Sequence, residues 1–570
     1  MRTYEQDAKT LELPWPFTGR QDELELVRDA TASCRRGIVV TGPAGRGKTR
    51  LITEAVRGMD HARVTGTPEA RHLPFAAFAH LLPDTGSLHG AVRALAGVRL
   101  LVVDDAHLLD EDSAALVHQL AAHGRTRLVV AATEGAAAPG AVSRLWTGEL
   151  LPRLALAPLP AEDTTALLGP AGLDALTVRR LHRLCRGDLR LLRSLVTALG
   201  AGDGLVPVPG TGERAWRGPL PVTPVVREHL APVLERSAPG EREILERLAF
   251  AEPGRLPSHD LDLDVLERLE AAGLIAVDDA GGVALADPLH GPALRATTGR
   301  LRARRLSRDA DGHAAALDAE QRFLARRLEQ MDVRPVATPV GDWVVGEGGP
   351  VPAGYAAVRA RFARLGGAVR DAAAWAREGM RWAPGDAGCG AELELAEAES
   401  DESGRECVAG DVYACYGAVR LGHPAGPLPA GSVLARHAEA LARGDGGALD
   451  LAAAALEERG FLLFAAEAYA QAVRVHRDPR AARCSRTRAL ALARRCQGAR
   501  TPALAGLVLG ELTARQRQVV ALAAAGLSNR EIAERLTLSV RTVGNHLYSA
   551  YTRLGTGDRG ALPCLVGEPA

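Results

Sequence analysis

Residues 42–49 read Gly42-Pro43-Ala44-Gly45-Arg46-Gly47-Lys48-Thr49 and follow the short apolar run Gly37-Ile38-Val39-Val40-Thr41. The octapeptide fits the pattern G-x-x-x-x-G-K-[ST], in which a glycine-rich loop joins a buried strand to a helix. Glycine lets the backbone turn its N–H groups inward around phosphates, and the helix N-terminus adds a partial positive charge. The pattern predicts a phosphate-binding loop whose nucleotide-binding residues are Gly42, Gly45, Gly47, Lys48 and Thr49, with the Thr49 hydroxyl as a ligand of Mg²⁺.

Lysine usage singles out the same loop. Of the 69 lysine and arginine residues, only Lys9 and Lys48 are lysines. Arginine carries a wide planar fork, whereas lysine is a compact point charge that can reach a β- or γ-phosphate through a narrow loop. We infer that residue 48 needs an ammonium group, and we expect ATP to bind there.

Two further apolar runs carry polar residues at their carboxyl ends. Residues 98–103 lead into Asp104 and Asp105, and residues 127–132 lead into Thr133. We expect Asp104 to hold Mg²⁺, Asp105 to orient or deprotonate an attacking water, and Thr133 to sense the γ-phosphate. Strands that alternate with helices predict a parallel α/β sheet. The alternative for this region is a vestigial loop that binds no nucleotide.

Length and composition limit the folds and functions that are possible for the rest of the chain. With 570 residues the chain is too long for one core, and its 4% aromatic content in an Ala-, Leu- and Arg-rich sequence favours helices. The formal net charge is zero, so any DNA-binding surface has to be local. No apolar run is long enough to cross a membrane, residues 1–10 are charged, and the eight cysteines form no C-x-x-C pair. These features predict a cytoplasmic protein with reduced thiols and no membrane partner.

The middle of the chain is mostly helical in pattern. Residues 151–199 read as helices, residues 201–224 as a Gly/Pro-rich linker, and residues 335–354 as a Gly/Pro break. Two helices and a hairpin within 241–285 suggest a winged-helix-like module. The Ala-rich residues 355–497 suggest helix pairs of the TPR-like, solenoid type. This region is interpreted either as a sensor that binds an inducer or a protein partner, or as a passive scaffold between two working ends.

Residues 512–547 contain sequence signals for the starts and ends of helices. Thr513 with Gln516, and Ser528 with Glu531, fit capping boxes, Gly526 ends the first helix, and Ser539 caps the third. A short turn at 537–538 between the second and third helices predicts helix-turn-helix geometry. Apolar residues at helical spacing predict a compact core: Val519, Val520, Leu522, Ile532, Ala533, Leu536, Val540, Val543, Leu547, Tyr551 and Leu554.

Residues 540–554 would then be the recognition helix in the major groove. Over residues 513–560 seven arginines face three acidic residues, a local charge of about +4 that suits DNA. Asparagine can pair with adenine, and arginine with guanine or phosphate. The alternative is a helix-turn-helix used only for protein contact. The candidate DNA-binding residues are Asn529, Ser539, Arg541, Thr542, Asn545, Tyr548 and Arg553.

Both ends of the chain resemble one family. The stretches 17–24, 73–78 and 103–110, which read Phe-x-Gly-Arg-x-x-Glu-Leu, Leu-Pro-Phe-Ala-Ala-Phe and Val-Asp-Asp-Ala-His-Leu-Leu-Asp, resemble the large ATP-binding LuxR-type regulators of the STAND class. Residues 512–547 resemble the LuxR-type DNA-binding domain. The resemblance implies a nucleotide switch rather than a fast metabolic enzyme. It also implies that Gly544, Asn545 and Tyr548 face bases, while Ser539, Thr542 and Arg553 lie near phosphates.

Five positions depart from that family. Glu134 stands where the family usually has arginine, and Gly187-Asp188-Leu189 stands for the Gly-Asn-Pro near the adenine. Asp287-Pro288 stands for a His-Pro in the winged-helix region. Gly544 replaces a long polar residue, and Pro563 falls inside the fourth helix, which in the family helps two domains pair on DNA.

The predicted architecture is multidomain, with an N-terminal α/β P-loop NTPase and a C-terminal all-α helix-turn-helix. The predicted segments are a P-loop ATPase core at 1–155, a helical lid and linker at 156–222, a winged-helix-like module at 223–300, a helical repeat-like sensor or scaffold at 301–505, and the helix-turn-helix domain at 506–570.

The predicted function is that of an ATP-binding, sequence-specific transcriptional regulator, an activator, whose nucleotide state gates its DNA-binding domain. Expected partners are double-stranded promoter DNA, RNA polymerase and further copies of the chain, with slow ATP hydrolysis serving as a switch. Two alternatives stay open. One is an active NTPase that does signalling work, and the other is a nucleotide-locked interaction scaffold.

Overall fold

The computed structural model forms two compact units. The first comprises Met1–Leu167, Arg186–Leu192 and Leu512–Tyr548, and the second comprises Leu168–Cys185, Arg193–Glu511 and Ser549–Ala570. The structure describes residues 17–554 apart from 33–35, 83–86, 124–125, 203, 308–311, 337–339, 401–411, 425–426, 506–513, 525 and 537.

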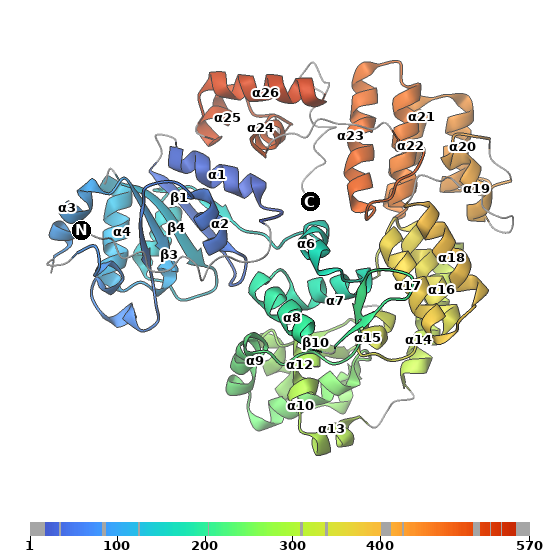
Figure 1. Cartoon of the computed structure of the whole chain (residues 1–570), viewed down its shortest axis with the longest axis horizontal. Helices are drawn as coiled ribbons and strands as arrows, with labels where there is room; N and C mark the ends of the chain where they lie inside the picture. Colours follow the sequence, from blue (N-terminus) through green and yellow to red (C-terminus); the bar gives the residue numbers. More distant parts are fainter. Residues whose placement is uncertain are drawn as a thin grey trace. The chain divides into compact units, whose positions relative to one another are not determined.

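A parallel five-stranded sheet forms the centre of the first unit (Figure 1). Its order is β2-β3-β4-β1-β5, so that β4 lies between β1, which leads into the glycine-rich loop, and β3, which leads into Asp104. The carboxyl ends of parallel strands lie at one edge, so this order brings three candidate segments together. The strands are β1 Gly37–Gly42, β2 Ala62–Thr65, β3 Leu100–Asp104, β4 Arg127–Thr133 and β5 Arg153–Ala155.

Helices cover both faces of this sheet. Successive strand residues point to opposite faces, so Val40 and Val102 pack with α1 and α2, whereas Val39 and Val103 pack with α4 and α5. Both faces are apolar because both are buried, as expected of a parallel sheet. The helices of this unit are α1 Gln21–Ala32, α2 Lys48–Ala55, α3 Leu88–Ala94, α4 Glu111–His123, α5 Gly140–Thr147 and α6 Ala161–Leu168.

The predicted parallel α/β sheet and its three expected strands are confirmed, but two edge strands were not expected. β2 has only four residues and β5 only three. The prediction of continuous helix over 151–199 is wrong at its start, because residues 153–155 pair with β1 as the edge strand β5. Such short edge segments carry too few residues to show a period of two.

The second unit begins with lid helices and a small hairpin. The expected linker at 201–224 is ordered in part, because β6 and β7 pair within it and Trp216 is fully buried. The predicted winged-helix-like module is present as helices α9 to α12 around the antiparallel sheet β8-β10-β9. The bounds are α7 Ala175–Cys185, α8 Leu189–Ala201, β6 Leu205–Pro207, β7 Arg214–Trp216, α9 Pro224–Arg236, α10 Pro239–Ala251, β8 Leu256–Pro257, α11 Leu263–Ala271, β9 Ile275–Val277, β10 Gly282–Leu285 and α12 His290–Thr297.

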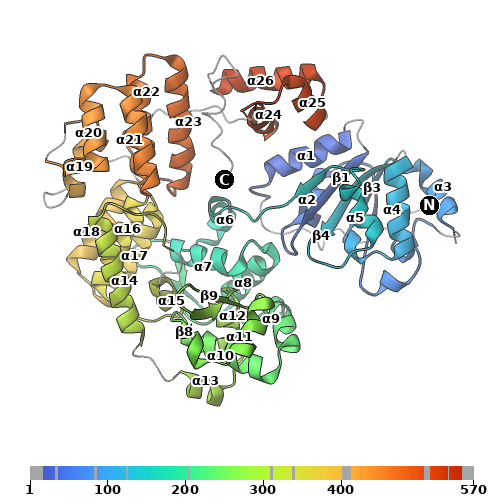
Figure 2. The ribbon, with the colours of Figure 1, turned by 180° about the vertical axis from the view of Figure 1, so that it is seen from behind.

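A helical region completes the second unit, and most of its helices pack against their neighbours in sequence (Figure 2). Asp386, Asp445 and Asp478 begin three of these helices by accepting backbone N–H bonds. The expected break at 335–354 contains a further helix, α15. The helices are α13 Arg300–Leu306, α14 Gly312–Glu329, α15 Val340–Gly346, α16 Ala353–Leu365, α17 Val369–Trp382, α18 Ala387–Ala398, α19 Val412–Arg420, α20 Val433–Arg443, α21 Gly446–Glu458, α22 Leu462–Val475 and α23 Pro479–Arg495.

Three short helices form the predicted helix-turn-helix segment: α24 Ala514–Ala524, α25 Asn529–Leu536 and α26 Val540–Leu554. Ser528 and Glu531 make the predicted capping box, and the Ser539 hydroxyl accepts the Thr542 N–H at 3.0 Å. The core prediction is wrong for Val540, which is 51% exposed because it is the first residue of α26. Thr513 and the fourth helix around Pro563 lie outside the described residues. The buried core residues are Val519, Val520, Ala523, Ile532, Ala533, Val543, Leu547 and Ala550.

Membrane-spanning helices and disulfides are two features that the sequence does not predict for this chain. Within residues 17–554, gaps aside, no helix is long and apolar enough to cross a membrane. The described cysteines 185, 389, 415, 484 and 496 are all free thiols.

Candidate nucleotide site and recognition helix

The glycine-rich loop has the backbone geometry that its sequence predicts. Gly42, Gly45 and Gly47 have φ angles of 150°, 75° and 86°, which side chains other than glycine rarely adopt. Gly47 immediately precedes α2, so the free N–H groups at the start of this helix lie in the loop. Free N–H groups at a helix start form a site for anions such as phosphate.

Lys48 lies almost completely inside this loop, with 7% of its surface exposed. Its Nζ donates hydrogen bonds to the carbonyl oxygens of Gly42 at 2.8 Å and Pro43 at 2.9 Å. Burial lowers the pKa of the Lys48 ammonium, while Asp105 and Asp104 oppose that change. The ammonium is therefore held in the loop by carbonyl oxygens and nearby carboxylates, poised to contact a phosphate.

Asp104 ends β3 and meets the first turn of α2. Its Oδ1 accepts the Thr49 hydroxyl at 3.1 Å, which brings together the two predicted Mg²⁺ ligands. Its Oδ2 pairs with Arg63 of β2 at 2.5 Å. Sequence reasoning did not anticipate Arg63, because no motif marks it and β2 was not predicted. The only available signal is its place two residues before the end of a strand that neighbours β3.

Asp105, the predicted catalytic residue, follows in the left-handed backbone conformation with φ 46°. Burial raises the pKa of its carboxyl, and the neighbouring Asp104 adds to that rise. A carboxylate with raised proton affinity is better suited to accept a proton from water. His107 is buried and lies close by, and burial lowers the pKa of its imidazole.

The end of β4 brings the third predicted contributor to the same edge. Thr133 is aligned with Gly42 across the β1–β4 pair, and its N–H faces Nδ1 of His107 at 3.4 Å. Glu134, which departs from the family's arginine, accepts a hydrogen bond from the Thr41 hydroxyl at 2.8 Å and pairs with Arg153 of β5. The hydrogen bond from Thr41 lowers the pKa of Glu134, and Arg153 contributes to that effect. The side chain at residue 134 is thus tied to the strands beside the loop.

Residues 186–192 cover the glycine-rich loop. The Leu189 N–H donates to the Gly45 carbonyl at 2.9 Å, and Arg46 donates to the Arg186 carbonyl at 2.7 Å. A Cβ atom placed on Gly45 would lie 2.0 Å from Oδ1 of Asp188. Asp188 accepts the N–H groups of Arg190 and Leu191, which begins α8. Residues 187–189 are therefore packed against the loop.

The structure brings the predicted nucleotide residues together at one edge of the sheet. They come from β1, the start of α2, and the ends of β3 and β4. Residues of this type and arrangement can bind a triphosphate, hold one divalent cation through oxygen atoms, and accept a proton from water.

The predicted recognition helix α26 presents a separate face. Arg541, Asn545 and Tyr548 are exposed, and their spacing of four and three residues places them on one side of the helix. Tyr548 is 75% exposed, which is unusual for a large aromatic side chain. The opposite side of α26 carries the buried residues Val543 and Leu547.

The other predicted DNA-binding residues lie at helix starts or at the end of α26. Ser539 and Thr542 share a hydrogen bond of 2.7 Å between their hydroxyls. Asn529 begins α25 and is half-buried. Arg553 belongs to α26, but its side chain lies outside the described residues.

Comparison with curated proteins finds relatives of a short stretch of this chain. A 71-residue stretch is 45% identical to an HTH-type transcriptional regulator of Mycobacterium bovis and to two of Mycobacterium tuberculosis. The match covers 12% of this chain and 8% of each relative, so the chain spans a small part of the length of these relatives.

Similarity to solved structures is distant. The Aeropyrum pernix ORC1 protein, solved in complex with DNA, is 15% identical, with a TM-score of 0.29 over 50% of this chain and 94% of that one. A RuvB variant of Thermotoga maritima is also 15% identical, with a TM-score of 0.25 over 46% of this chain and 90% of that one. Residues 510–566 match the family model described as bacterial regulatory proteins, luxR family, and they form a LuxR-type helix-turn-helix domain.

Proposed function

We propose that this chain is a transcriptional regulator that binds promoter DNA through residues 510–566 and ATP through residues 42–49. The observation that carries the proposal is the exposed face of Arg541, Asn545 and Tyr548 within a LuxR-type segment. The nucleotide half rests on the gathering of the predicted phosphate and metal residues at one sheet edge.

The glycine-rich loop would hold the triphosphate of ATP. The N–H groups at the start of α2 face the loop, and Lys48 supplies a buried positive charge there. Thr133 at the end of β4 is suited to contact the terminal phosphate. A nucleotide at this position would replace the carbonyl partners of the Lys48 ammonium with phosphate oxygens of higher charge.

Mg²⁺ fits the oxygen donors of Thr49 and Asp104. A magnesium ion in such a site takes one or two protein ligands and completes its shell with phosphates and waters. When bound, the ion would neutralise charge on the β- and γ-phosphates.

ATP hydrolysis, in this proposal, is slow and serves as a switch. Asp105 would orient or deprotonate the attacking water, and its raised pKa favours the proton transfer. Arg63 occupies one oxygen of Asp104, so that the carboxylate has a competing partner for any cation. This competition is consistent with low turnover.

Coupling between nucleotide and DNA would begin at residues 186–192. These residues bond to the glycine-rich loop, and they follow directly after α7, which ends at Cys185. Arg186 and Gly187 both have positive φ angles, 46° and 83°. A rearrangement of the loop around a nucleotide would therefore act on the bend that joins α7 to residues 186–192.

DNA recognition would follow from the chemistry of α26. Asn545 is suited to an adenine edge, and Arg541 to a guanine edge or a phosphate. Ser539, Thr542, Asn529 and Arg553 would contact the backbone. Gly544 offers no side chain, so readout depends on its neighbours. Activation through RNA polymerase and assembly of several copies on DNA complete the proposal.

The test is a selection of DNA fragments bound by the full chain with and without ATP and Mg²⁺, followed by sequencing. The recovered site then serves in anisotropy titrations of wild type, Lys48→Ala and Asn545→Ala. The proposal expects ATP to change the DNA affinity of wild type but not of Lys48→Ala, and Asn545→Ala to weaken binding in both states.

Two outcomes would favour the rivals. Several turnovers per second with DNA binding indifferent to ATP would indicate an active NTPase that DNA merely locates. No hydrolysis, together with unchanged reporter expression in Lys48→Ala, would indicate a nucleotide-locked scaffold.

A further inference from the structure

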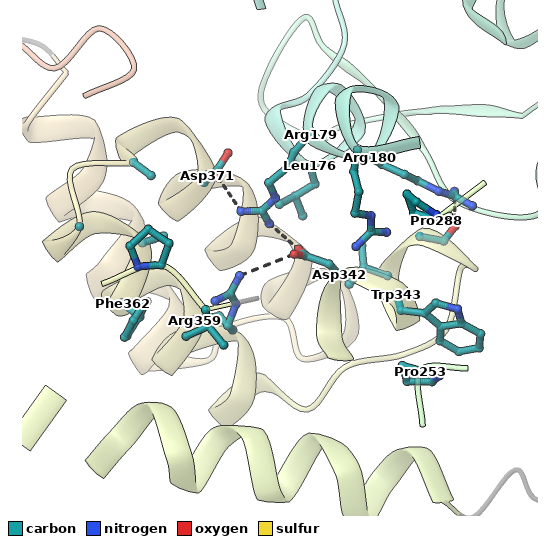
Figure 3. Close-up of a pocket in the computed structure, with 18 of the residues that line it drawn as sticks. Leu176, Arg179, Arg180, Pro253, Pro288, Asp342, Trp343, Arg359, Phe362 and Asp371 are labelled. Carbon is teal, nitrogen blue, oxygen red and sulfur yellow. Dashed lines mark hydrogen bonds and ion pairs between the residues drawn. The ribbon is translucent and has the colours of Figure 1, made fainter. Parts of the chain in front are cut away.

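A cavity of about 1150 Å³ lies inside the second unit, lined by α7, the winged-helix-like module and helices of the helical region. This volume exceeds the roughly 300–1,000 Å³ of typical small-molecule sites. Figure 3 shows that side chains from separate segments converge on it. Its apolar lining includes Leu176, Trp216, Pro253, Pro288, Trp343 and Phe362.

Positive charge dominates the polar part of this lining. Eight arginines face the cavity, whereas only five acidic residues do. The arginines are Arg179, Arg180, Arg183, Arg217, Arg255, Arg334, Arg359 and Arg495. The acidic residues are Glu252, Asp342, Asp371, Glu457 and Glu458.

Most of the negative charge is already paired. Arg179 bridges Asp342 and Asp371, with 2.6 Å to the latter (Figure 3). Glu252 pairs with Arg295 at 2.6 Å. Three of the five carboxylates are therefore neutralised within the protein. Four of the arginines are paired as well, namely Arg180, Arg217, Arg255 and Arg334. The positive charge that stays available to a ligand lies mainly on Arg359 and Arg183.

Arg359 of α16 is a buried arginine with a poor set of partners. Its side chain is buried, with 5% of the residue exposed, and its Nε has no hydrogen-bond acceptor among the described residues. Its closest carboxylate contact is 3.8 Å, to Asp342, and its guanidinium lies 5.3 Å from the ring centroid of Trp375. A buried N–H without an acceptor is unfavourable, so an acceptor supplied by a ligand would stabilise this position.

Two further arginines on α7 fit the same interpretation. Arg180 stacks 3.6 Å from the ring centroid of Trp216 and donates to the Gly218 carbonyl at 3.0 Å. Burial lowers the pKa of Arg180 to about 9, although Glu347 opposes that effect. Arg183, half-buried, has neither a hydrogen bond nor an ion pair within the described chain. The cavity wall on α7 thus presents one buried, stacked guanidinium and one guanidinium without a partner among the described residues.

We propose that this cavity binds a small organic anion, a carboxylate or a phosphate monoester attached to an aromatic or aliphatic body. The guanidinium of Arg359 takes the charged end, because its planar fork matches both oxyanions. The tryptophan, proline and phenylalanine side chains take the apolar body. The site is separate from the glycine-rich loop, and its binding does not depend on the proposed nucleotide function.

The test uses three probes that share a phenyl ring: phenylacetate, phenyl phosphate and neutral 2-phenylethanol. Calorimetric titrations of the full chain are run in the Lys48→Ala background, so that phosphate binding at the glycine-rich loop does not contribute. We expect at least one anion to bind tenfold or more tightly than 2-phenylethanol. The tighter of the two anions identifies carboxylate or phosphate as the preferred group.

Arginine variants assign the charge contact. Arg359→Met should lower the affinity for the anion to that of the neutral probe, and Arg359→Lys should keep part of it. Arg443→Met removes an arginine from an exposed pair on α20 that does not line the cavity, and should change nothing. Because Arg359→Met removes a buried ion pair, Arg183→Met provides a second variant, for which we expect a loss of about threefold.

The proposal is overturned if the neutral probe binds as tightly as both anions. It is also overturned if anions bind equally well to wild type, Arg359→Met and Arg183→Met, provided that the melting temperatures show folded protein.

Discussion

The glycine-rich loop and the recognition helix are built in opposite ways. Lys48 and Asp104 are 7% and 3% exposed, and each makes hydrogen bonds or ion pairs inside the protein. Asn545 and Tyr548 project from α26 into solvent, and only the opposite side of that helix is buried. The side chains of the glycine-rich site belong to the interior of the protein, whereas those of the recognition helix lie on the surface above a core that they do not help to form.

This difference separates stability from binding. A substitution in the loop should disturb the folded state as well as the ligand, because the same atoms serve both. A substitution on the exposed face of α26 should alter binding alone, since surface changes away from such features are nearly neutral for folding.

The largest expected effect is the loss of ATP binding in Lys48→Ala. Removal of a buried ammonium from the phosphate site should weaken ATP by roughly 100-fold, about 3 kcal/mol. Calorimetric titration with ATP and Mg²⁺ measures it. Lys48→Arg is the sharper variant, because it keeps the charge but brings a wide fork into a narrow loop, and we expect it to bind ATP nearly as poorly. Full affinity in Lys48→Arg would show that charge alone is needed.

The second largest effect is expected for Gly45→Ala, which should lower the stability of the folded protein. The alanine would have to adopt φ 75°, and its Cβ would lie 2.0 Å from Asp188. We expect a loss of about 3 kcal/mol in unfolding free energy, made up of backbone strain and displacement of residues 186–192.

Gly58→Ala is the matched control for that change. Gly58 has φ 80°, but nothing lies within 4 Å of the position that an added Cβ would take. Its cost should be the strain alone, about 1 kcal/mol. Urea titrations of both variants compare the two. Equal costs would mean that the contact of Asp188 with the loop does not hold the segment in place.

Local patterns explain how much of each site could be predicted. The glycine-rich loop, Asp104 with Asp105, and the capping of α25 and α26 are contained within a few consecutive residues, so their chemistry is visible in the sequence. The exposed face of α26 follows from helical spacing alone. These predictions required no knowledge of which segments meet in space.

Contacts between distant segments were not predictable in the same way. Arg63 and Arg153 reach the nucleotide site from the short edge strands β2 and β5, which lack a visible period. Trp216 is buried although it lies in a segment rich in glycine and proline. The cavity beside α16 depends on residues spread from Leu176 to Arg495, and no local motif marks it.

A smaller effect is expected for Asn545→Ala. Loss of one base contact should weaken binding to the selected DNA site by about 1–3 kcal/mol, while the melting temperature stays unchanged because the side chain is exposed. Anisotropy titrations and thermal unfolding measure the two quantities. Arg530→Ala on α25 removes an exposed arginine paired with Glu534 and shows, for comparison, the effect of losing one positive charge in the same domain. A large fall in melting temperature for Asn545→Ala would contradict the separation of binding from stability.

The smallest expected effect concerns Asp105 and pH. Burial and the charge of Asp104 raise its pKa above the usual 3.8, so the folded protein holds this proton more tightly than the unfolded chain does. The stabilisation from the protonated form is complete below 3.8 and is lost as pH rises through the folded pKa. Residue 105 cannot ionise in Asp105→Asn. The melting temperature of this variant should therefore rise relative to that of wild type as pH increases through this window, and the difference should stay constant at higher pH.

The same variant should lose ATP turnover at every pH, because asparagine cannot accept a proton. Wild-type turnover should fall as pH drops through the folded pKa of Asp105. Since the carboxyl is partly solvated, the stability difference should be small, and paired thermal melts of the two proteins are needed to resolve it. If the melting temperature of Asp105→Asn instead exceeds that of wild type by more as the pH falls, Asp105 is stabilised as the carboxylate. The glycine-rich site would then favour its negative charge.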